Sequence, residues 1–264
     1  MSILSHSELL TRIEKIGCDK TSLTLPRQAA LAILAGAFIA LGGILSVYVG
    51  FGIPGIAAAN PGLQKLLSGL MFPVGLFLIV LFGGELFTGN NAVLMPGCFR
   101  GHFGLLSVIK NWILVWSFNF VGALAFTYIF VYFSGLTAAE PYHTAVINIA
   151  QAKASLPWGV AFVKGIAANW CVCLAVWLCL MVNSLPAKAL ACVIPVGAFV
   201  VLGYEHCIAN MFFIPVGMLE GAAVDISGLF NNLIPVTAGN IVGGALLVGA
   251  LFYVVHRPTG CIGK

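Results

Sequence analysis

The chain has 264 residues, of which 61% are apolar and only 8% are charged, and its formal net charge is +4. A water-soluble domain carries about a quarter charged residues, so the composition excludes a soluble enzyme and a disordered linker protein. The net charge is also too small and too scattered for a nucleic-acid-binding protein. An apolar chain of this length instead predicts several membrane-spanning helices of about 20 residues each.

The N-terminal segment is polar and contains acids, which is not the pattern of a cleavable signal peptide. Ser5-x-x-Glu8 forms a capping box, and Leu9, Ile13 and Ile16 share one face of the helix that follows it. We expect a short amphipathic helix that lies on the membrane surface. A frayed tail is the alternative for this segment.

Six apolar segments follow, and polar residues interrupt two of them. The segments cover residues 27–50, 64–95, 105–134, 158–182, 186–217 and 233–255. The second contains the run 83–91 (GGELFTGNN), and the fifth contains the run 203–210 (GYEHCIAN). Acidic and amide side chains at bilayer depth persist mainly where they face a cavity or a partner. We therefore expect the second and fifth helices to be broken at these runs.

The two interruptions match each other. Gly83-x-Glu85-x4-Asn90 recurs as Gly203-x-Glu205-x4-Asn210 at an offset of 120, and Asn111, Asn119 and Gly122 recur as Asn232, Asn240 and Gly243 at an offset of 121. A duplicated unit of three spans explains both matches, and an odd number of spans places the copies in opposite orientations. Inverted repeats with broken helices are typical of membrane transporters. The predicted fold is an all-α integral membrane protein with six transmembrane helices in two inverted three-helix repeats.

Lysine and arginine residues predict the orientation of the spans. With the N-terminus inside, nine of the twelve basic residues lie on the cytoplasmic side, Lys65 and Lys153 lie outside, and Lys164 lies within the fourth span. We therefore expect both termini to be cytoplasmic. The expected division is a cytoplasmic N-terminal segment (1–25), a channel domain (26–257) and a short cytoplasmic tail (258–264).

Cysteine and histidine positions argue against a cofactor. The eight cysteines include no Cys-x-x-Cys pair, and Cys171 and Cys173 point to different faces of one helix. His206 is the only histidine within a predicted span, whereas a haem, a di-metal site or an electron carrier needs paired ligands at one depth. We expect no metal, no cofactor and no enzymatic activity. The sequence also lacks the GxxxxGK[ST] motif of ATP-driven pumps.

The interrupted helices predict a site for a small anion. Each break creates a half-helix whose free N–H groups and positive dipole end point into the protein. His206 lies at one break and Thr88 at the other. Histidine can donate a hydrogen bond or lend a proton near neutral pH, and a threonine hydroxyl can donate or accept. The structural alternatives are that His206 only bridges two helix ends and that Thr88 bonds back within its own helix.

Lys153 precedes the fourth span on the outer side. It can draw anions into a vestibule, with Asn169 and Glu205 holding it in place. The alternative is an ordinary interfacial lysine that snorkels to the surface. Glu85 and Glu205 would repel an anion if they faced the pathway, so we expect them to accept bonds from free N–H groups of the broken helices or to pair with Lys153.

Three stretches resemble signature sequences of the formate/nitrite transporter family. They are GGELFTGNN (83–91), KGIAANWCVCLAVW (164–177) and GYEHCIANMFFIP (203–215). The resemblance runs from about Pro26 to Arg257. It implies a homopentamer in the lipid bilayer of the bacterial cytoplasmic membrane, with an aquaporin-like protomer and one pore per protomer. The implied substrates are formate first, nitrite next and hydrosulfide third.

The resemblance also implies roles for individual residues. His206 matches the central pore histidine, Thr88 its partner across the pathway, Lys153 the vestibule lysine, Asn169 the amide partner of that lysine, and Glu205 the adjoining acid. Leu76, Leu86 and Phe199 match the apolar constriction on one side of the histidine, and Phe72 and Val172 match the constriction on the other. Without the resemblance, these five apolar residues would be read as ordinary core packing.

Two versions of the mechanism stay open at this point. His206 can protonate the anion so that a neutral acid crosses the constriction, which makes permeation pH-dependent. Alternatively, His206 stays neutral and only donates a hydrogen bond to a partly hydrated anion. The competing function is an aquaporin-like pore for neutral solutes, although the Asn-Pro-Ala stretches typical of that class do not occur.

Overall fold

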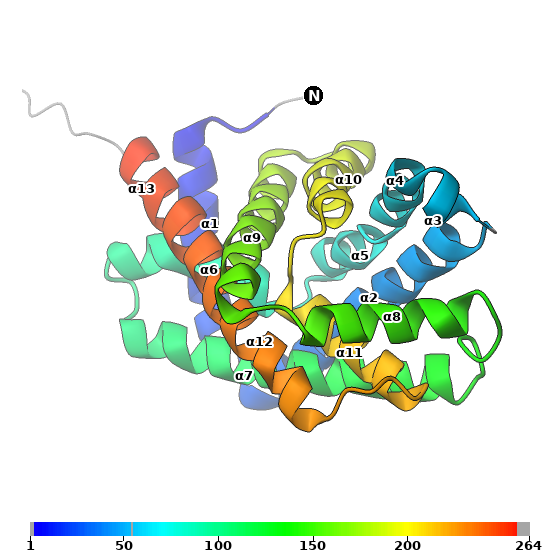
Figure 1. Ribbon diagram of the computed structural model, residues 1–264. Helices are drawn as coiled ribbons and strands as arrows, with labels where there is room; N and C mark the ends of the chain where they lie inside the picture. The colour runs from blue at the N-terminus through cyan, green and yellow to red at the C-terminus, as the bar shows by residue number, and fades with distance from the viewer. Residues whose placement is uncertain (1–2, 54, 258–264) are drawn as a thin grey trace, which may run out of the picture.

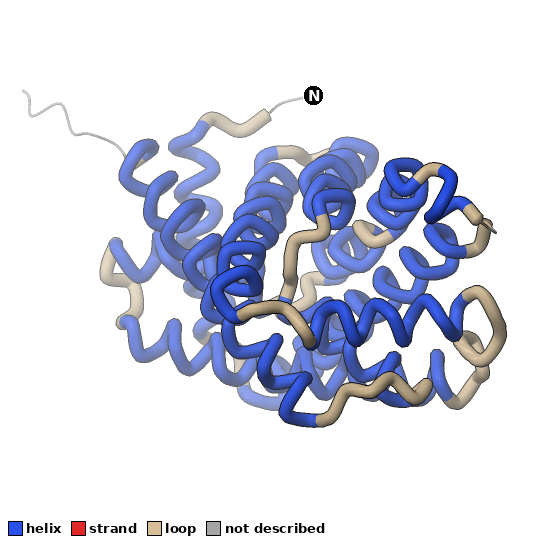
Figure 2. The backbone as a smooth tube through the Cα atoms, viewed as in Figure 1, coloured by secondary structure: helices blue, strands red, loops and turns tan. Residues whose placement is uncertain are grey.

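The computed structural model describes residues 3–53 and 55–257, and every regular element in this part of the chain is helical (Figures 1 and 2). The elements are α1 (His6–Thr21), α2 (Leu25–Phe51), α3 (Ile56–Ala59), α4 (Pro61–Met71), α5 (Val74–Phe82), α6 (Phe87–Phe99), α7 (Leu105–Phe126), the π-helix η1 (Thr127–Tyr132), α8 (Tyr142–Ala154), α9 (Trp158–Met181), α10 (Leu185–Leu202), α11 (Cys207–Leu219), α12 (Ile226–Ile241), the π-helix η2 (Val242–Ala250) and α13 (Leu251–His256). The predicted all-α fold is confirmed, while the predicted tail (258–264) lies outside the described residues.

Within residues 3–53 and 55–257, six helical stretches are long and apolar enough to cross a membrane, which is the predicted number. They cover Leu25–Phe51, Pro61–Phe82, Leu105–Tyr132, Trp158–Met181, Leu185–Leu202 and Ile226–His256. The last stretch begins well before the predicted residue 233. The reason is a helix cap, because the side chain of Asp225 accepts a hydrogen bond from the backbone N of Gly228 (2.8 Å) and so starts the helix within a polar sequence.

The second and fifth membrane segments are broken, as predicted. α5 ends at Phe82 and α10 ends at Leu202, and the glycine that follows each helix, Gly83 or Gly203, is left-handed, with φ of 69° and 68°. Glycine adopts this conformation without the steric penalty of other residues, so it ends a helix cleanly. Residues 84–86 and 204–206 then run without helical structure into the middle of the molecule, where α6 and α11 begin (Figure 2).

The chain consists of two copies of one unit in opposite orientations. In the first copy, α2 packs along α7 and α1 lies against α6; in the second, α9 packs along α12 and α8 lies against α11 (Figure 1). Each copy crosses the membrane three times, so the second copy is inverted relative to the first. The repeat also includes the short helices α1 and α8, which the sequence pattern did not reveal.

Glycines let the long helices of each copy touch backbone to backbone. A Cβ atom added to Gly36 would lie 2.0 Å from the carbonyl oxygen of Asn119, where α2 crosses α7. In the second copy, a Cβ on Gly239 would lie 2.2 Å from the carbonyl oxygen of Phe162, where α9 crosses α12. Any side chain at these positions would force the helices apart. Small residues at crossings are the usual way for membrane helices to pack closely.

The N-terminal helix α1 is amphipathic as predicted, but its apolar face does not lie on the membrane surface. Its capping box is formed by Ser5 and Glu8. Leu9 and Ile13 are buried in a cluster with Val93 of α6. That expectation is therefore wrong, because the apolar face of α1 packs against the middle of the half-helix α6 instead.

Candidate functional site

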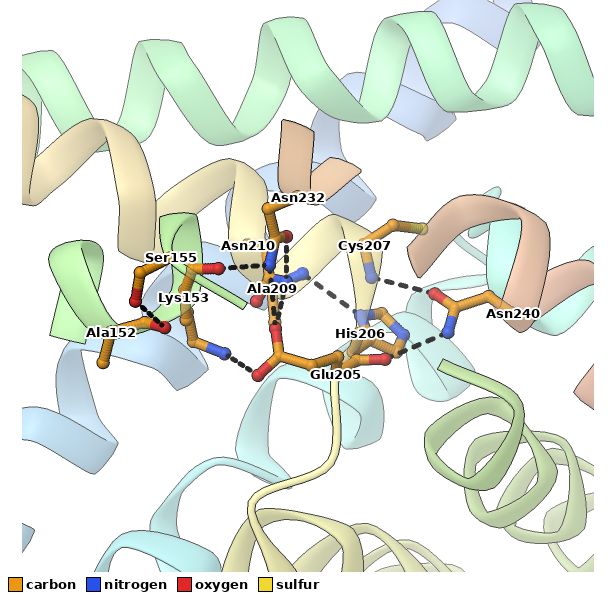
Figure 3. Close-up of polar contacts among 10 residues, drawn as sticks. All are labelled: Ala152, Lys153, Ser155, Glu205, His206, Cys207, Ala209, Asn210, Asn232 and Asn240. Carbon is orange, nitrogen blue, oxygen red and sulfur yellow. Dashed lines mark hydrogen bonds and ion pairs between the residues drawn. The ribbon is translucent and has the colours of Figure 1, made fainter. Parts of the chain in front are cut away.

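The two breaks meet at His206 and Thr88. The Nε2 atom of His206 lies 2.9 Å from the Oγ1 atom of Thr88, and the side chain of His206 is almost completely buried. The backbone N of Ala209 donates to Nδ1 of His206 (3.1 Å), so the histidine caps α11 (Figure 3). Because Nδ1 accepts this bond, the neutral ring carries its hydrogen on Nε2 and donates to Thr88. The threonine hydroxyl accepts this bond, so its own hydrogen is not used in it.

Asn240 supports the break that carries His206. Its Oδ1 accepts the backbone N of Cys207 (2.8 Å), the first residue of α11. Its Nδ2 donates to the carbonyl oxygens of Gly165 (2.7 Å) and Glu205 (3.0 Å), as Figure 3 shows in part. One buried amide thus satisfies the backbone of an extended segment that has no helical partners, which a protein interior requires.

Asn119 does the same for the first break. Its Oδ1 accepts the backbone N of Phe87 (2.9 Å), the first residue of α6. Its Nδ2 donates to the carbonyl oxygens of Ala32 (2.7 Å) and Glu85 (2.8 Å). The two asparagines, which the sequence repeat paired, therefore make equivalent hydrogen bonds to the backbone of the two breaks. We call each set of these bonds the frame of its break.

Each glutamate at a break is paired with a lysine. Lys153 Nζ lies 2.9 Å from Glu205 Oε1, and the other carboxylate oxygen accepts the Nδ2 groups of Asn210 (2.6 Å) and Asn232 (3.4 Å) (Figure 3). Of the two alternatives expected for Glu205, free N–H groups of the half-helix or pairing with Lys153, the structure has the pairing with Lys153. Side-chain amides take the rest of the role expected for the N–H groups, since they donate to the other carboxylate oxygen.

Glu85 has the same surroundings at the other break. It pairs with Lys20, at the end of α1, and accepts Asn90 Nδ2 at 2.8 Å, while Asn90 also donates to Asn111 (3.0 Å). The sequence interpretation missed Lys20 and offered Lys153 as a partner for both acids. One signal could have found Lys20: it lies in the last turn of the short helix α1, just as Lys153 lies in the last turn of the short helix α8.

Asn169 does not contact Lys153, which corrects the expected pairing. Its Nδ2 lies within hydrogen-bond distance of three acceptors: the carbonyl oxygens of Asn240 (2.6 Å) and Thr88 (3.2 Å), and Oδ1 of Asn91 (3.1 Å). It therefore lies behind Thr88, where it ties α9 to the start of α6 and to α12. Its contacts position Thr88 instead of a vestibule lysine.

Two cavities lie near the His206–Thr88 pair: His206 itself lines one, and Leu86 and Gly89, close to Thr88 in the chain, line the other. The Lys153 cavity, of about 180 Å³, is lined by Ser46, Gln64, Lys65, Phe72, Lys153, Phe199, His206 and Asn210, among others. The Lys20 cavity, of about 320 Å³, is lined by Lys20, Arg27, Leu31, Leu76, Leu86, Asn90, Val176 and Leu180, among others. Each cavity thus has a lysine and a break asparagine in its wall. The Lys20 cavity is also lined by Asp19, Arg27 and Glu85, so that one of the two break glutamates does face a cavity, where it is paired with Lys20.

The apolar residues divide between the cavities differently from the expectation. Leu76 and Leu86, which were expected on the same side of the histidine, both line the Lys20 cavity. Phe199, expected beside them, instead packs edge-on against Phe72 with ring centroids 5.6 Å apart, and both line the Lys153 cavity. Val172, expected beside Phe72, is buried in the apolar core and is not among the lining residues of either cavity. The correction follows from α10, which runs alongside α4 and so brings Phe199 to Phe72.

Comparison with known proteins identifies the family. The formate/nitrite transporter family matches residues 7–254. The chain belongs to this family. It is 39% identical to the "Probable formate transporter" of Methanothermobacter thermautotrophicus, with 90% of this chain and 91% of that protein covered. It is 36% identical to the formate channel FocA of Escherichia coli, with 92% of this chain and 91% of that protein covered.

Solved structures of this family share the fold. An FNT family ion channel superposes with a TM-score of 0.87 at 27% identity and covers 94% of this chain and 98% of its own. A pentameric formate channel with formate bound superposes with a TM-score of 0.77 at 30% identity, covering 89% and 98%. This formate/nitrite transporter is therefore a membrane transport protein and not an enzyme, and its two inverted repeats are those of the family fold.

Proposed function

We propose that the chain conducts small monovalent anions across a membrane, formate first, through the Lys153 cavity, the His206–Thr88 pair and the Lys20 cavity. The observation that carries the proposal is the hydrogen bond between His206 and Thr88, because it joins the two helix breaks at a buried point between two lysine-bearing cavities. The relatives named as formate transporters or channels support formate as the first substrate. Nitrite and then hydrosulfide follow as substrates of the same pathway.

The charges and dipoles explain how an anion reaches the middle of the protein. Moving a small ion into a low-dielectric region has an idealised cost of order 20 kcal/mol. Lys153 and Lys20 offset part of this cost at the two cavities, each while paired with its glutamate. The N-terminal ends of α6 and α11 add positive potential where the breaks meet. The apolar side chains Phe72, Phe199 and Leu86 then exclude large and strongly hydrated ions.

His206 makes permeation dependent on pH. In its neutral form it donates through Nε2 and accepts the Ala209 N–H through Nδ1. A second proton must enter at Nδ1, which requires that bond to break, so the charged form is reached only when the cap of α11 opens. In acid, the protonated ring gives its proton to formate, and formic acid crosses the apolar walls as a neutral molecule.

The pathway lies within one protomer, and we propose that five protomers assemble as in the pentameric formate channel with formate bound. The distribution of basic residues supports cytoplasmic termini in a bacterial cytoplasmic membrane. In this orientation the Lys20 cavity, which Ile16, Asp19, Lys20 and Leu23 of the N-terminal segment line in part, opens to the cytoplasm. Residues 26–257 form the channel domain.

Uptake by liposomes tests the function directly. The purified chain is reconstituted, and entry of formate, nitrite, hydrosulfide, water and glycerol is followed by light scattering at several external pH values. We expect formate uptake above that of empty liposomes, rising as the pH falls, and no glycerol uptake. Glycerol or water entry without anion entry would instead support the aquaporin-like function.

A histidine variant separates the two mechanisms. In the proposed mechanism, His206→Asn keeps a side chain that can hydrogen-bond and loses the rise of uptake in acid. His102→Asn is the matched control, since His102 lies at the exposed end of α6 beside Glu14. If His206→Asn kept an unchanged pH dependence, proton transfer by His206 would be eliminated and only the hydrogen-bonding role would remain.

A further inference from the structure

Two buried cysteines face each other outside the proposed pathway. Cys179 lies in the last turn of α9, and Cys192 lies in the second turn of α10. Their Sγ atoms are 3.4 Å apart, and both side chains are fully buried. Only residues 182–184 join the two helices, so the thiols connect the two arms of one helical hairpin.

The contact is a hydrogen-bonded thiol pair. Cys179 Sγ lies 3.5 Å from the carbonyl oxygen of Lys188 and can donate to it. With its hydrogen engaged there, the sulfur of Cys179 accepts from the thiol of Cys192. A disulfide bond has a length of about 2.05 Å, so the two sulfurs need to approach by only about 1.4 Å, which side-chain rotation within a packed hairpin can supply.

We propose that Cys179 and Cys192 are a disulfide-forming modification site that fastens α9 to α10. The oxidant is a small-molecule disulfide. The thiolate of Cys179, which lies two residues before the end of α9 and is exposed when this last turn opens, attacks one of its sulfurs and releases the first small thiol, leaving a mixed disulfide on Cys179. The thiolate of Cys192 then attacks the sulfur of Cys179 and releases the second small thiol. Two protein thiols are oxidised, one small disulfide is reduced to two thiols, and the two protons pass to the leaving thiolates.

The position of the pair gives the bond a structural consequence. Val176 lies one turn before Cys179, and Leu180 follows it directly; both line the Lys20 cavity. α10 carries Phe199, which lines the Lys153 cavity. The bond would therefore fix the relative position of two helices that supply walls to both cavities.

Peptide mapping tests the proposal on the folded full chain. The protein in liposomes is treated with 4,4′-dithiodipyridine, its remaining thiols are alkylated, and cyanogen bromide cleaves it at methionine. Met181 lies between the two cysteines, so Cys179 falls in fragment 96–181 and Cys192 in fragment 182–211. We expect the two fragments to remain linked in most molecules until dithiothreitol is added. Sequencing of the linked fragments identifies the joined cysteines.

Serine variants give the controls. Fragment 182–211 also contains Cys207, so in a Cys207→Ser chain Cys192 is the only thiol of that fragment. In that background, Cys179→Ser should abolish the linkage, whereas Cys171→Ser, on the same helix, should leave it intact. Fragments that stay separate in the wild-type chain, or a linkage that survives Cys179→Ser, would overturn the proposal. The wild-type mapping decides the matter even if a variant fails to fold.

Discussion

The two broken helices share one hydrogen-bonding frame but place different side chains between them. Asn119 and Asn240 make equivalent bonds, and Glu85 and Glu205 each hold a lysine and an asparagine. At the matched offset, however, Leu86 stands where the second half has His206, and Ile208 stands where the first half has Thr88. The frame is duplicated, whereas each half contributes one different polar group to the centre. This difference separates the residues that build the breaks from those proposed to handle the solute.

The largest effect should come from the frame. In Asn119→Ala or Asn240→Ala, the first N–H of the half-helix and two backbone carbonyls each lose a hydrogen bond, and a buried group left unpaired costs about 1–3 kcal/mol. We expect both variants to lose most of their folded protein, to a similar extent, in thermal unfolding of the purified chain. If only one half proved sensitive, the two frames would not be energetically equivalent.

The second-largest effect should come from breaking the ion pairs at the two breaks. Lys153→Ala leaves Glu205 largely buried and unpaired, and the loss of a partner from a buried pair costs roughly 3 kcal/mol or more. We expect a lower unfolding temperature and slower formate uptake. Adding Glu205→Gln should restore the unfolding temperature but not the uptake.

The same comparison can be made in the first half, between Lys20→Ala alone and Lys20→Ala combined with Glu85→Gln. The same pattern is expected, because Lys20 and Lys153 have equal side-chain exposure of 17%. Uptake that depended on only one lysine would show that one cavity controls entry.

Exchanging the central side chains sharpens the contrast without disturbing the frame. His206→Leu gives the second break the residue of the first. A hydrogen bond to a charged group is worth about 1.5–3 kcal/mol, so formate uptake should fall roughly 10- to 100-fold. The unfolding temperature should change much less than in the asparagine variants. Leu86→His should not rescue the His206→Leu chain, since it cannot reproduce the bond to Thr88; a rescue would contradict the proposed arrangement.

The smallest effect concerns the start of α1. Hydrogen bonds from Ser5 to the carboxylate of the exposed Glu8 hold its pKa below the usual range. A carboxylate with a lowered pKa stabilises the helix above its ordinary pKa and loses this contribution as the pH falls through the lowered value. Ser5→Ala should therefore weaken protection of α1 against amide hydrogen exchange at neutral pH and flatten its dependence on acid. Unchanged protection would show that packing on α6 alone holds the helix.

Much of this arrangement could be predicted from local patterns. Apolar length gave the six spans, and the repeated Gly-x-Glu-x4-Asn gave both breaks and their inversion. The Lys20–Glu85 pair could not be found in this way, because Lys20 and Lys153 are 133 positions apart and the repeated motifs only 120 or 121. Asn169 and Phe199 were misplaced for a related reason. Which neighbour an amide or a ring meets depends on how α9 and α10 pack, and residue type does not determine that.

The glycine crossings have a consequence for how the proposed passage can discriminate. Where α2 meets α7 at Gly36 and α9 meets α12 at Gly239, main chain rests on main chain. Helices in such contact cannot close further, and sliding them apart would uncover polar groups of the breaks. The width of the proposed passage is thus set by helices in fixed contact, and we expect it to change only when side chains such as Phe72 or Leu86 rotate. Selection by size then needs no hinge or domain motion.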